Sequence, residues 1–202
     1  MSDAPLIVGV DEVGRGPLAG PVVAAAVVLC NPIPDGLADS KKLTAARRGK
    51  LDTVIRECCA YGIGVVEAEV IDRLNIFSAT MLAMTQAVDR LSLIMHEKGL
   101  GAPEKVLVDG PHTPAGRVRE WVWQAEGVVG GDGTVPAISA ASIVAKEYRD
   151  GLMVKAAEQF DEYGWDRNKG YATREHLKAL QESGPSPLHR RSFAPLRQQT
   201  LI

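Results

Sequence analysis

Residues 7–29, IVGVDEVGRGPLAGPVVAAAVVL, are the stretch that decides the fold of this chain. Apolar residues over 6–10 predict a short buried strand, and the apolar run over 22–29 predicts a second one. A turn rich in glycine and proline lies between them and reverses the chain. The two strands therefore form a hairpin-like unit, and the first carries two adjacent carboxylates, Asp11 and Glu12, towards the turn.

Asp11 and Glu12 are neighbours on a strand, so their side chains point to opposite faces of a regular sheet. We expect both to serve one site only if the strand ends or bulges there. Gly14, Arg15 and Gly16 follow, and the glycines expose backbone groups that another molecule can approach closely. The alternative is an ordinary hairpin with surface charges, because turns collect Gly, Pro and Asp in any protein.

Length and composition predict one domain over residues 1–202, since the 202 residues are 46% hydrophobic and can bury a substantial core. The formal net charge of -2 argues against a basic coat for nucleic acid but leaves room for a basic patch beside an acidic site. Three cysteines without metal-ligand or redox spacing, the lack of a secretory leader and the lack of a membrane-length apolar run predict a cytoplasmic protein outside the membrane. We expect a monomer.

Strands and helices alternate along the rest of the chain. Apolar periodicity predicts helices after Thr44, over 76–98 and from 138 to about 163, and strands over 63–70 and 106–108. This order, with a hairpin first and helices later, predicts an α/β fold with a mixed sheet flanked by helices.

Four carboxylates fall where an apolar strand ends or where glycines form a loop: Asp11, Glu12, Asp109 and Asp132. Such acids in one cleft repel one another unless cations neutralise them, and oxygen ligands select Mg²⁺ or Mn²⁺. Two such ions can activate a water and stabilise the leaving oxygen of a phosphodiester, so hydrolysis of a nucleic acid is the predicted reaction. The alternative is that each acid is an ordinary loop residue.

A nuclease site also needs cations that contact phosphates. The candidates beside the main motifs are Arg15, Lys41, Lys42, Lys146, Lys169, Arg190 and Arg191. Each of them, taken alone, is alternatively a solvated surface charge.

Several sequence blocks follow one another over nearly the whole chain. They are DEVGRGPLAGPV at 11–22, DSKKL at 39–43, VDG at 108–110, GD at 131–132, SAASIVAK at 139–146 with RD at 149–150, KGY at 169–171 with Thr173 and His176, and HRRSF at 189–193. Together they resemble ribonuclease HII, the type 2 ribonuclease H.

The resemblance implies an endonuclease that cuts the RNA strand of RNA-DNA hybrids. It also implies nicking on the 5′ side of single ribonucleotides in duplex DNA, with 3′-hydroxyl and 5′-phosphate ends. The implied fold is a ribonuclease H-like mixed sheet whose helical C-terminal part, about 163–202, closes on the duplex. By the same resemblance, Asp11, Glu12, Asp109 and Asp132 bind the metal and catalyse, residues 14–16 read the ribose 2′-hydroxyl, and Tyr171 stacks at the RNA-DNA junction.

The chain departs from the family pattern at three places. Gly130 stands where Lys is usual, Asn168 where His is frequent, and Glu147-Tyr148 where Val-Thr is familiar. His176 and His189, which belong to the blocks above, are interpreted as structural polar contacts and not as catalytic residues.

Two functions other than a nuclease also fit parts of the sequence. Gly14-x-Gly16-x-x-x-Gly20 is an alternative phosphate loop of a nucleotide-binding α/β protein, but its spacing differs from a dinucleotide fingerprint and its prolines break the expected helix. A non-catalytic module that binds hybrids through the basic tail is the second. Dependence of strand cleavage on divalent cations separates both from a nuclease.

Overall fold

The computed structural model describes residues 6–38, 40 and 43–199. A five-stranded sheet has the strand order β3-β2-β1-β4-β5. Its strands are β1 (Ile7–Val13), β2 (Val22–Val28), β3 (Ala60–Val66), β4 (Lys105–Asp109) and β5 (Ala125–Val128). β1, β2 and β3 pair antiparallel, whereas β4 runs parallel to both β1 and β5. The predicted hairpin and mixed sheet are therefore confirmed.

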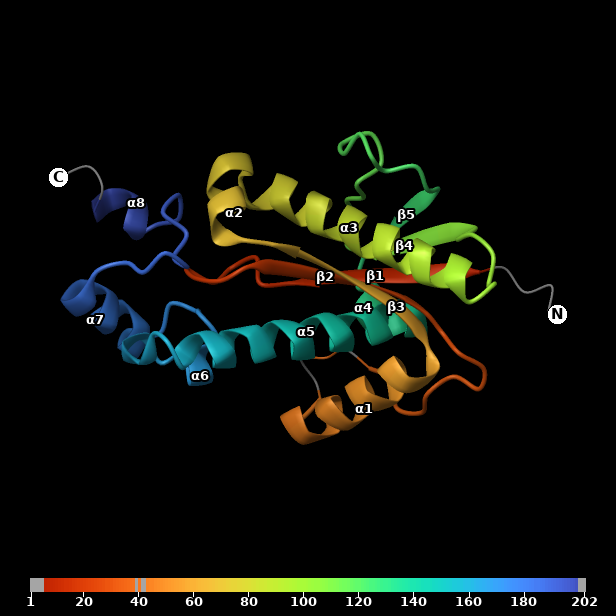
Figure 1. Cartoon of the computed structure of the whole chain (residues 1–202), viewed down its shortest axis with the longest axis horizontal. Coiled ribbons are helices and arrows are strands. Elements are labelled where there is room, and N and C mark those ends of the chain that lie inside the picture. The colour runs from red at the N-terminus through yellow and green to blue at the C-terminus, as the bar shows by residue number, and fades with distance from the viewer. Residues whose placement is uncertain (1–5, 39, 41–42, 200–202) are drawn as a thin grey trace.

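Helices cover both faces of this sheet (Figure 1). They are α1 (Ala45–Cys58), α2 (Ala68–Leu74), α3 (Ile76–Glu97), α4 (Gly131–Thr134), α5 (Pro136–Ala157), α6 (Trp165–Asn168), α7 (Arg174–Ser183) and α8 (Leu196–Gln199), with a short 3-10 helix η1 at Asp161–Tyr163. One core joins α3 to one face of the sheet, and a second core joins α1 and α5 to the other.

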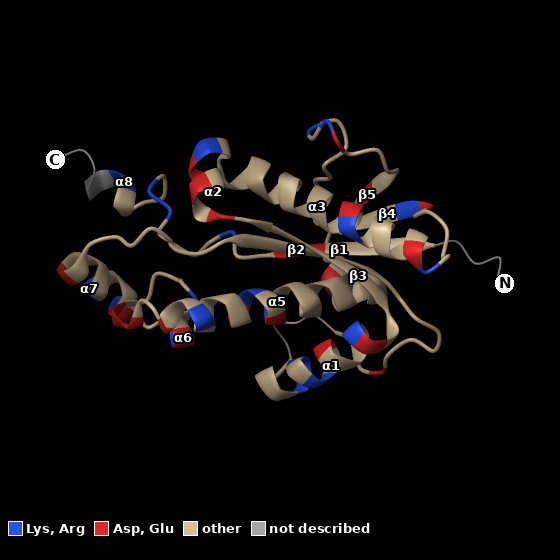
Figure 2. Ribbon diagram, viewed as in Figure 1, with Lys and Arg blue, Asp and Glu red and all other residues tan. Residues whose placement is uncertain are grey.

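β2 lies at the centre of both cores because all seven of its residues are apolar and buried. Val22, Ala24 and Ala26 pack towards α3, whereas Val23 and Ala25 pack towards α1 and α5. Figure 2 shows charged residues mainly on the helices and loops around it. A strand that is apolar on both sides is typical of a sheet covered on both faces.

Two glycines let the long helices approach the sheet closely. A Cβ atom at Gly9 of β1 would collide with the backbone of Ala137 at the start of α5. A Cβ at Gly64 of β3 would collide with the backbone of Ala83 in α3. α5 therefore begins directly against β1, the strand that carries Asp11 and Glu12.

Element boundaries differ from the prediction in two places. The strand predicted over 63–70 is β3, Ala60–Val66, and its last residues instead begin α2 at Ala68. The helix predicted from 138 to about 163 starts at Pro136, a residue favoured in the first turn, and ends at Ala157. The predicted cap at Thr44 is confirmed, since its side chain accepts a hydrogen bond from the Arg47 N–H at 3.3 Å.

The C-terminal part is tied to the turn between β1 and β2 by backbone hydrogen bonds. Leu18 donates to the Gly170 carbonyl at 2.8 Å, Gly20 donates to Leu188 at 2.9 Å, and Arg190 donates back to Leu18 at 2.8 Å.

The described helices include none with the length and apolar composition of a membrane span.

Candidate active site

Three carboxylates converge at the end of the parallel pair β1 and β4. The register pairs Val10 with Val108, so the residues that follow, Asp11 and Asp109, come to the same edge of the sheet. Carboxylate oxygens of Asp11, Asp109 and Asp132 lie within 4.8 Å of one another. The sequence predicted that Asp132 lies in a glycine loop. It lies instead in the short helix α4, which follows β5. Its N–H donates to the Asp109 carboxylate at 3.2 Å.

Glu12 lies on the other face of the sheet from Asp11. β1 pairs regularly with β2 through Val13, with Asp11 opposite Ala25 and Glu12 opposite Ala24. β1 therefore has no bulge at these two acids, and it ends at Val13, one residue after Glu12. The acids meet for a different reason: β4 ends at Asp109, and beyond that end Glu12 shares a cavity with Asp109 that α3 helps to line.

Burial and mutual repulsion disfavour the ionised form of these acids when no cation is present. Burial raises the pKa of Asp11 well above its ordinary value, and the neighbouring charge of Glu12 adds to this effect. Burial also raises the pKa of Glu12, although Arg15, 3.2 Å away, opposes the shift. Divalent cations remove this repulsion, and an all-oxygen ligand set suits Mg²⁺ or Mn²⁺. The acids present therefore fit a metal site.

Two buried arginines hold the turn that follows these acids. Arg190 is fully buried and donates to the carbonyls of Gly14, Arg15, Pro17 and Gly20. The burial of Arg190 contradicts the predicted phosphate contact, because the guanidinium donates its hydrogen bonds to backbone oxygens inside the protein. Arg149 of α5, also fully buried, donates to the carbonyls of Ala19, Pro21 and Lys169.

Arg149 was not among the predicted site residues, although the sequence contains a signal for it. It lies four residues after Ala145 and four before Met153, both buried on α5, so it interrupts an apolar helix face with a charge. A buried charge needs partners, and the turn supplies them as carbonyl oxygens. The turn runs into β2 and not into a helix, which removes the helix N-terminus that a nucleotide-phosphate loop uses.

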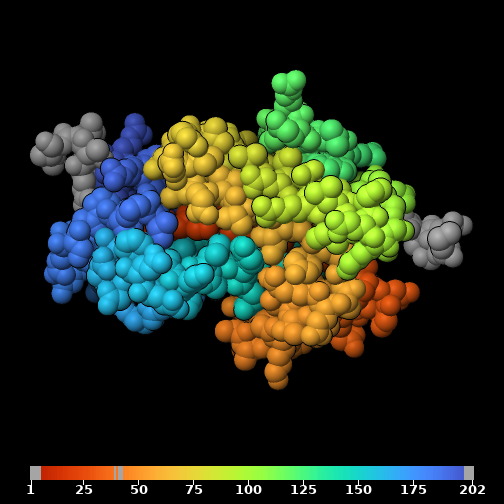
Figure 3. All heavy atoms as spheres, viewed as in Figure 1, coloured from red at the N-terminus to blue at the C-terminus, as the bar shows by residue number. Residues whose placement is uncertain are grey.

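Tyr171 lies beside this turn and the acids. It lines one cavity together with Asp11, Glu12, Val13, Ser40, Ser142 and Lys146. A Cβ atom at Gly16 would lie 3.8 Å from the Tyr171 ring. The side chain is 44% exposed, so it is not a core aromatic. Figure 3 shows red atoms of the N-terminal segment at the bottom of a hollow, between yellow α2 and α3 on one side and blue-green α5 and the C-terminal part on the other.

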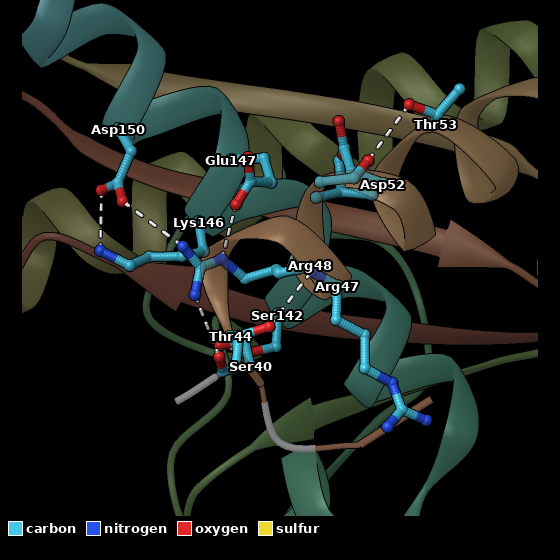
Figure 4. A network of polar contacts seen from close by, with 12 residues as sticks. Ser40, Thr44, Arg47, Arg48, Asp52, Thr53, Ser142, Lys146, Glu147 and Asp150 are labelled. Atoms are coloured by element: carbon cyan, nitrogen blue, oxygen red, sulfur yellow. Dashed lines mark hydrogen bonds and ion pairs between the residues drawn. The ribbon is translucent and has the colours of Figure 1, made fainter. Parts of the chain in front are cut away.

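Lys146 reaches this cavity from α5 within a polar network (Figure 4). Its ammonium donates to Asp150 at 2.7 Å. Beside it, Glu147 accepts from Arg48 of α1 at 2.6 Å, and the hydroxyls of Ser40 and Ser142 lie 2.8 Å apart. The departure from the family pattern at Glu147 thus has a structural consequence, an ion pair between α1 and α5.

The other cations that were predicted to contact phosphates have different surroundings. Arg15 is exposed and paired with Glu12. Arg191 is exposed, and its backbone N–H donates to Asp72 at 2.8 Å. The side chain of Lys169 donates to the Asp166 carbonyl. Lys41 and Lys42 lie outside the described residues.

The other two departures from the family pattern, Gly130 and Asn168, also have structural consequences. Gly130 caps α4 in a left-handed conformation with φ +69°, where a side chain would be strained. Asn168 donates to the Tyr163 carbonyl at 2.7 Å and accepts from the Gly170 N–H at 2.8 Å. Asn168 therefore shapes the backbone that leads to Tyr171.

His176 and His189 are buried and contact each other through their Nε2 atoms at 3.0 Å. Trp165 donates to Nε2 of His176, and Ser186 donates from its N–H to Nδ1 of His189. With both rings neutral, His176 donates from Nδ1 to the Tyr171 carbonyl at 2.9 Å, and its Nε2 is the acceptor that Trp165 and His189 share. Burial lowers the pKa of both, that of His189 to about 4.

Comparison with known proteins identifies the family. The family model described as ribonuclease HII matches residues 8–196. The chain belongs to the ribonuclease HII family. The ribonuclease HII of Novosphingobium aromaticivorans is 61% identical over 196 residues, covering 96% of this chain and 98% of that protein.

Solved structures share the fold. A ribonuclease H2 from Pyrococcus horikoshii OT3 superposes with a TM-score of 0.72 at 24% identity and covers 95% of each chain. A Bst-RNase HIII in complex with Mn2+ superposes with a TM-score of 0.74 at 16% identity, over 98% of this chain and 70% of that one. The predicted family, ribonuclease H-like fold and enzyme class are confirmed, and the chain is a type 2 ribonuclease H, an endonuclease of RNA-DNA hybrids.

Proposed function

We propose that this chain also nicks duplex DNA on the 5′ side of a single embedded ribonucleotide, by two-metal-ion catalysis that leaves 3′-hydroxyl and 5′-phosphate ends. The observation that supports this most is a juxtaposition. The three aspartates within 4.8 Å of one another lie beside a turn with exposed backbone and beside a half-exposed tyrosine.

Asp11, Glu12, Asp109 and Asp132 are the proposed ligands of Mg²⁺ or Mn²⁺. Such ions, when bound, supply an activated water and stabilise the leaving oxygen of the phosphodiester. The protein contributes rigid placement of the acids. Asp11 and Asp109 sit on paired strands, and the Asp132 N–H is bonded to Asp109. Ligands on such elements need little rearrangement when a metal binds.

The turn at 14–16 is the proposed reader of the ribose 2′-hydroxyl, which both donates and accepts hydrogen bonds. Arg190 and Arg149 fix residues 14–21, which include this turn, from inside the protein through six hydrogen bonds to backbone carbonyls, and Arg149 also donates to the carbonyl of Lys169. A pre-organised backbone loses little entropy when it binds. Gly16, without a side chain, allows the ribose to approach between the turn and Tyr171.

The remaining substrate contacts are proposed from position. Lys146 lies in the same cavity as Asp11 and is suited to a phosphate next to the cleaved bond. Arg15 and Arg191 are exposed and are suited to phosphates further away. Residues from about 163 onwards are the proposed segment that closes on the duplex, and we expect the enzyme to work as a monomer in the cytoplasm.

The test is a DNA duplex with one ribonucleotide, labelled at the 5′ end of the strand that contains it. In Mg²⁺ or Mn²⁺ we expect one nick directly 5′ of the ribonucleotide, with a 3′-hydroxyl that a DNA polymerase extends. EDTA should abolish the nick. Asp132→Asn removes one charge from the cluster and should suppress the nick. Equal cleavage by that variant, or cleavage in EDTA, contradicts the proposed site.

A further inference from the structure

A cluster of three cysteines lies at the end of the sheet away from the carboxylates. Cys30 follows the end of β2, while Cys58 and Cys59 lie at the end of α1 directly before β3. Because Val28 pairs with Ala60, these segments are adjacent. They meet at the right of the view in Figure 1, where α1 ends near the loop that leaves β2.

The sulfur atoms are close enough to share one ion. Sγ of Cys59 lies 3.3 Å from that of Cys30 and 3.6 Å from that of Cys58, and all three lie within 4.8 Å of one another. Three thiolates around a metal at about 2.3 Å are roughly 4 Å apart, so the observed spacing needs only small adjustments. The chain has three cysteines in total, and the fold brings all of them here.

A backbone hydrogen bond to Sγ of Cys59 favours the thiolate form that binds a metal. The N–H of Cys30 donates to Sγ of Cys59 at 3.2 Å. Such N–H bonds to sulfur stabilise a thiolate and recur around metal-bound cysteines. Cys59 is 2% exposed, Cys30 is half-buried and Cys58 is exposed, so an ion can enter from solvent and reach the inner sulfur.

The ligand set decides which metal suits the cluster. Among the described residues, no histidine or carboxylate joins these three sulfurs. Soft thiolates select Cu(I) and Zn²⁺, but structural Zn²⁺ takes four protein ligands. We propose that Cys30, Cys58 and Cys59 bind one Cu(I) ion through three thiolates. Binding displaces the thiol protons into solvent.

The proposed ion joins the end of β2 to the junction of α1 and β3, and it is remote from the nuclease site. Ala25, which pairs with Asp11, is five residues from Cys30, roughly 17 Å along an extended strand. Copper should therefore raise the melting temperature of the protein without entering the Mg²⁺-dependent reaction.

The test is an anaerobic titration of the reduced full chain with Cu(I) against the chelator bicinchoninate, in the presence of MgCl2. We expect one Cu(I) per chain and a higher melting temperature. Cys30→Ser, Cys58→Ser and Cys59→Ser should each weaken binding by about a hundredfold or more. Val54→Ser, at an exposed position of α1, is the matched control and should bind copper like the wild type.

Cys58→Ser is the decisive variant because its side chain is exposed, so the fold should tolerate the change. Its melting temperature without copper should match that of the wild type, and its hybrid cleavage in Mg²⁺ should be unchanged. Any one of three results overturns the proposal: no uptake of Cu(I) by the wild type, equal uptake by Cys58→Ser, or displacement of Cu(I) by an equal concentration of Zn²⁺.

Discussion

The guanidinium of Arg190 donates a hydrogen bond of 2.6 Å to the carbonyl oxygen of Gly14, 176 residues earlier in the chain. The same side chain bonds three further carbonyls of the turn, and Arg149 bonds two more. Both arginines are fully buried. The backbone proposed to face the substrate is thus fixed from inside the protein by two side chains that are buried themselves.

Arg190→Ala should therefore lower stability more than it lowers affinity for a duplex. The buried carbonyls would lose their donors, which costs about 3 kcal/mol of the free energy of unfolding. Arg190→Lys should recover little, since an ammonium lacks the planar fork that reaches several carbonyls at once. Urea unfolding measures the effect, and Arg191→Ala on the exposed neighbour should change it by less than about 0.5 kcal/mol. A stable Arg190→Ala protein with weakened duplex binding would restore Arg190 as a phosphate contact.

The buried histidine pair should make the protein sensitive to acid. Burial, together with the neighbouring His176, lowers the pKa of His189 from 6.5 to about 4. Between these values the unfolded chain binds a proton that the folded chain does not, so stability present above pH 6.5 is lost as the pH falls through about 4. Melting temperature against pH should therefore fall less steeply for His189→Gln than for the wild type. His96→Gln, an exposed histidine, is the control and should follow the wild type.

The sequence was sufficient to predict the sheet and the position of the acids for a local reason. Apolar runs end at Asp11 and at Asp109, and parallel neighbouring strands deliver such ends to one edge. The face to which each acid points depends on the pairing of β1 with β2. A regular register and a bulged one have the same sequence pattern, so the sequence left open whether β1 bulges at Asp11 and Glu12.

Long-range partners explain the other differences. Arg190 and Arg191 are adjacent basic residues in the same motif, yet one is fully buried and the other exposed. What distinguishes them is the turn at 14–20, which is distant in sequence and packs over Arg190 only in the folded chain. The three cysteines show the same limit, because their 28-residue separation conceals a contact that β2 and β3 create by pairing.

Replacing Asp11 should stabilise the protein when no divalent cation is present. Asp11 is buried within 4.8 Å of the oxygens of Asp109 and Asp132, so Asp11→Asn relieves repulsion. We expect the melting temperature in EDTA to rise by about 2–4 °C, which corresponds to roughly 1 kcal/mol for a chain of this size. Mg²⁺ should remove the difference by stabilising the wild type alone. Asp35→Asn, in an exposed loop, is the control, and a marked loss of melting temperature in Asp11→Asn would identify Asp11 as structural.

Lys146 should account for part of the salt dependence of binding. Its ammonium lies in the cavity of Asp11 and Tyr171, held by Asp150. Lys146→Ala should weaken binding to every duplex about equally and reduce the slope of log K against log salt by about 1. Lys155→Ala, an exposed lysine further along α5, should leave the slope unchanged. An unchanged slope for Lys146→Ala as well would show that its charge serves only Asp150.

Tyr171 should determine whether the enzyme distinguishes a ribose-to-deoxyribose junction. Its ring lies next to Gly16 and is 44% exposed, while its backbone is fixed separately by Asn168 and His176. Removing the side chain should therefore leave the fold intact. Stacking of an aromatic ring contributes about 1–3 kcal/mol, so Tyr171→Ala should cut a single embedded ribonucleotide about tenfold or more slowly.

Two further variants separate recognition from packing. Tyr171→Phe keeps the ring and loses the hydroxyl, so its rate on the single ribonucleotide should fall between those of the wild type and Tyr171→Ala. Tyr163→Phe loses a partly buried hydrogen bond of 2.7 Å from its hydroxyl to the Gly184 carbonyl, and should lower the melting temperature without changing substrate preference. The measurement is the ratio of cleavage rates on the single-ribonucleotide duplex and on a continuous hybrid. If Tyr171→Ala slows both substrates equally and melts at a lower temperature, Tyr171 is a packing residue, because a junction contact acts on only one of the two substrates.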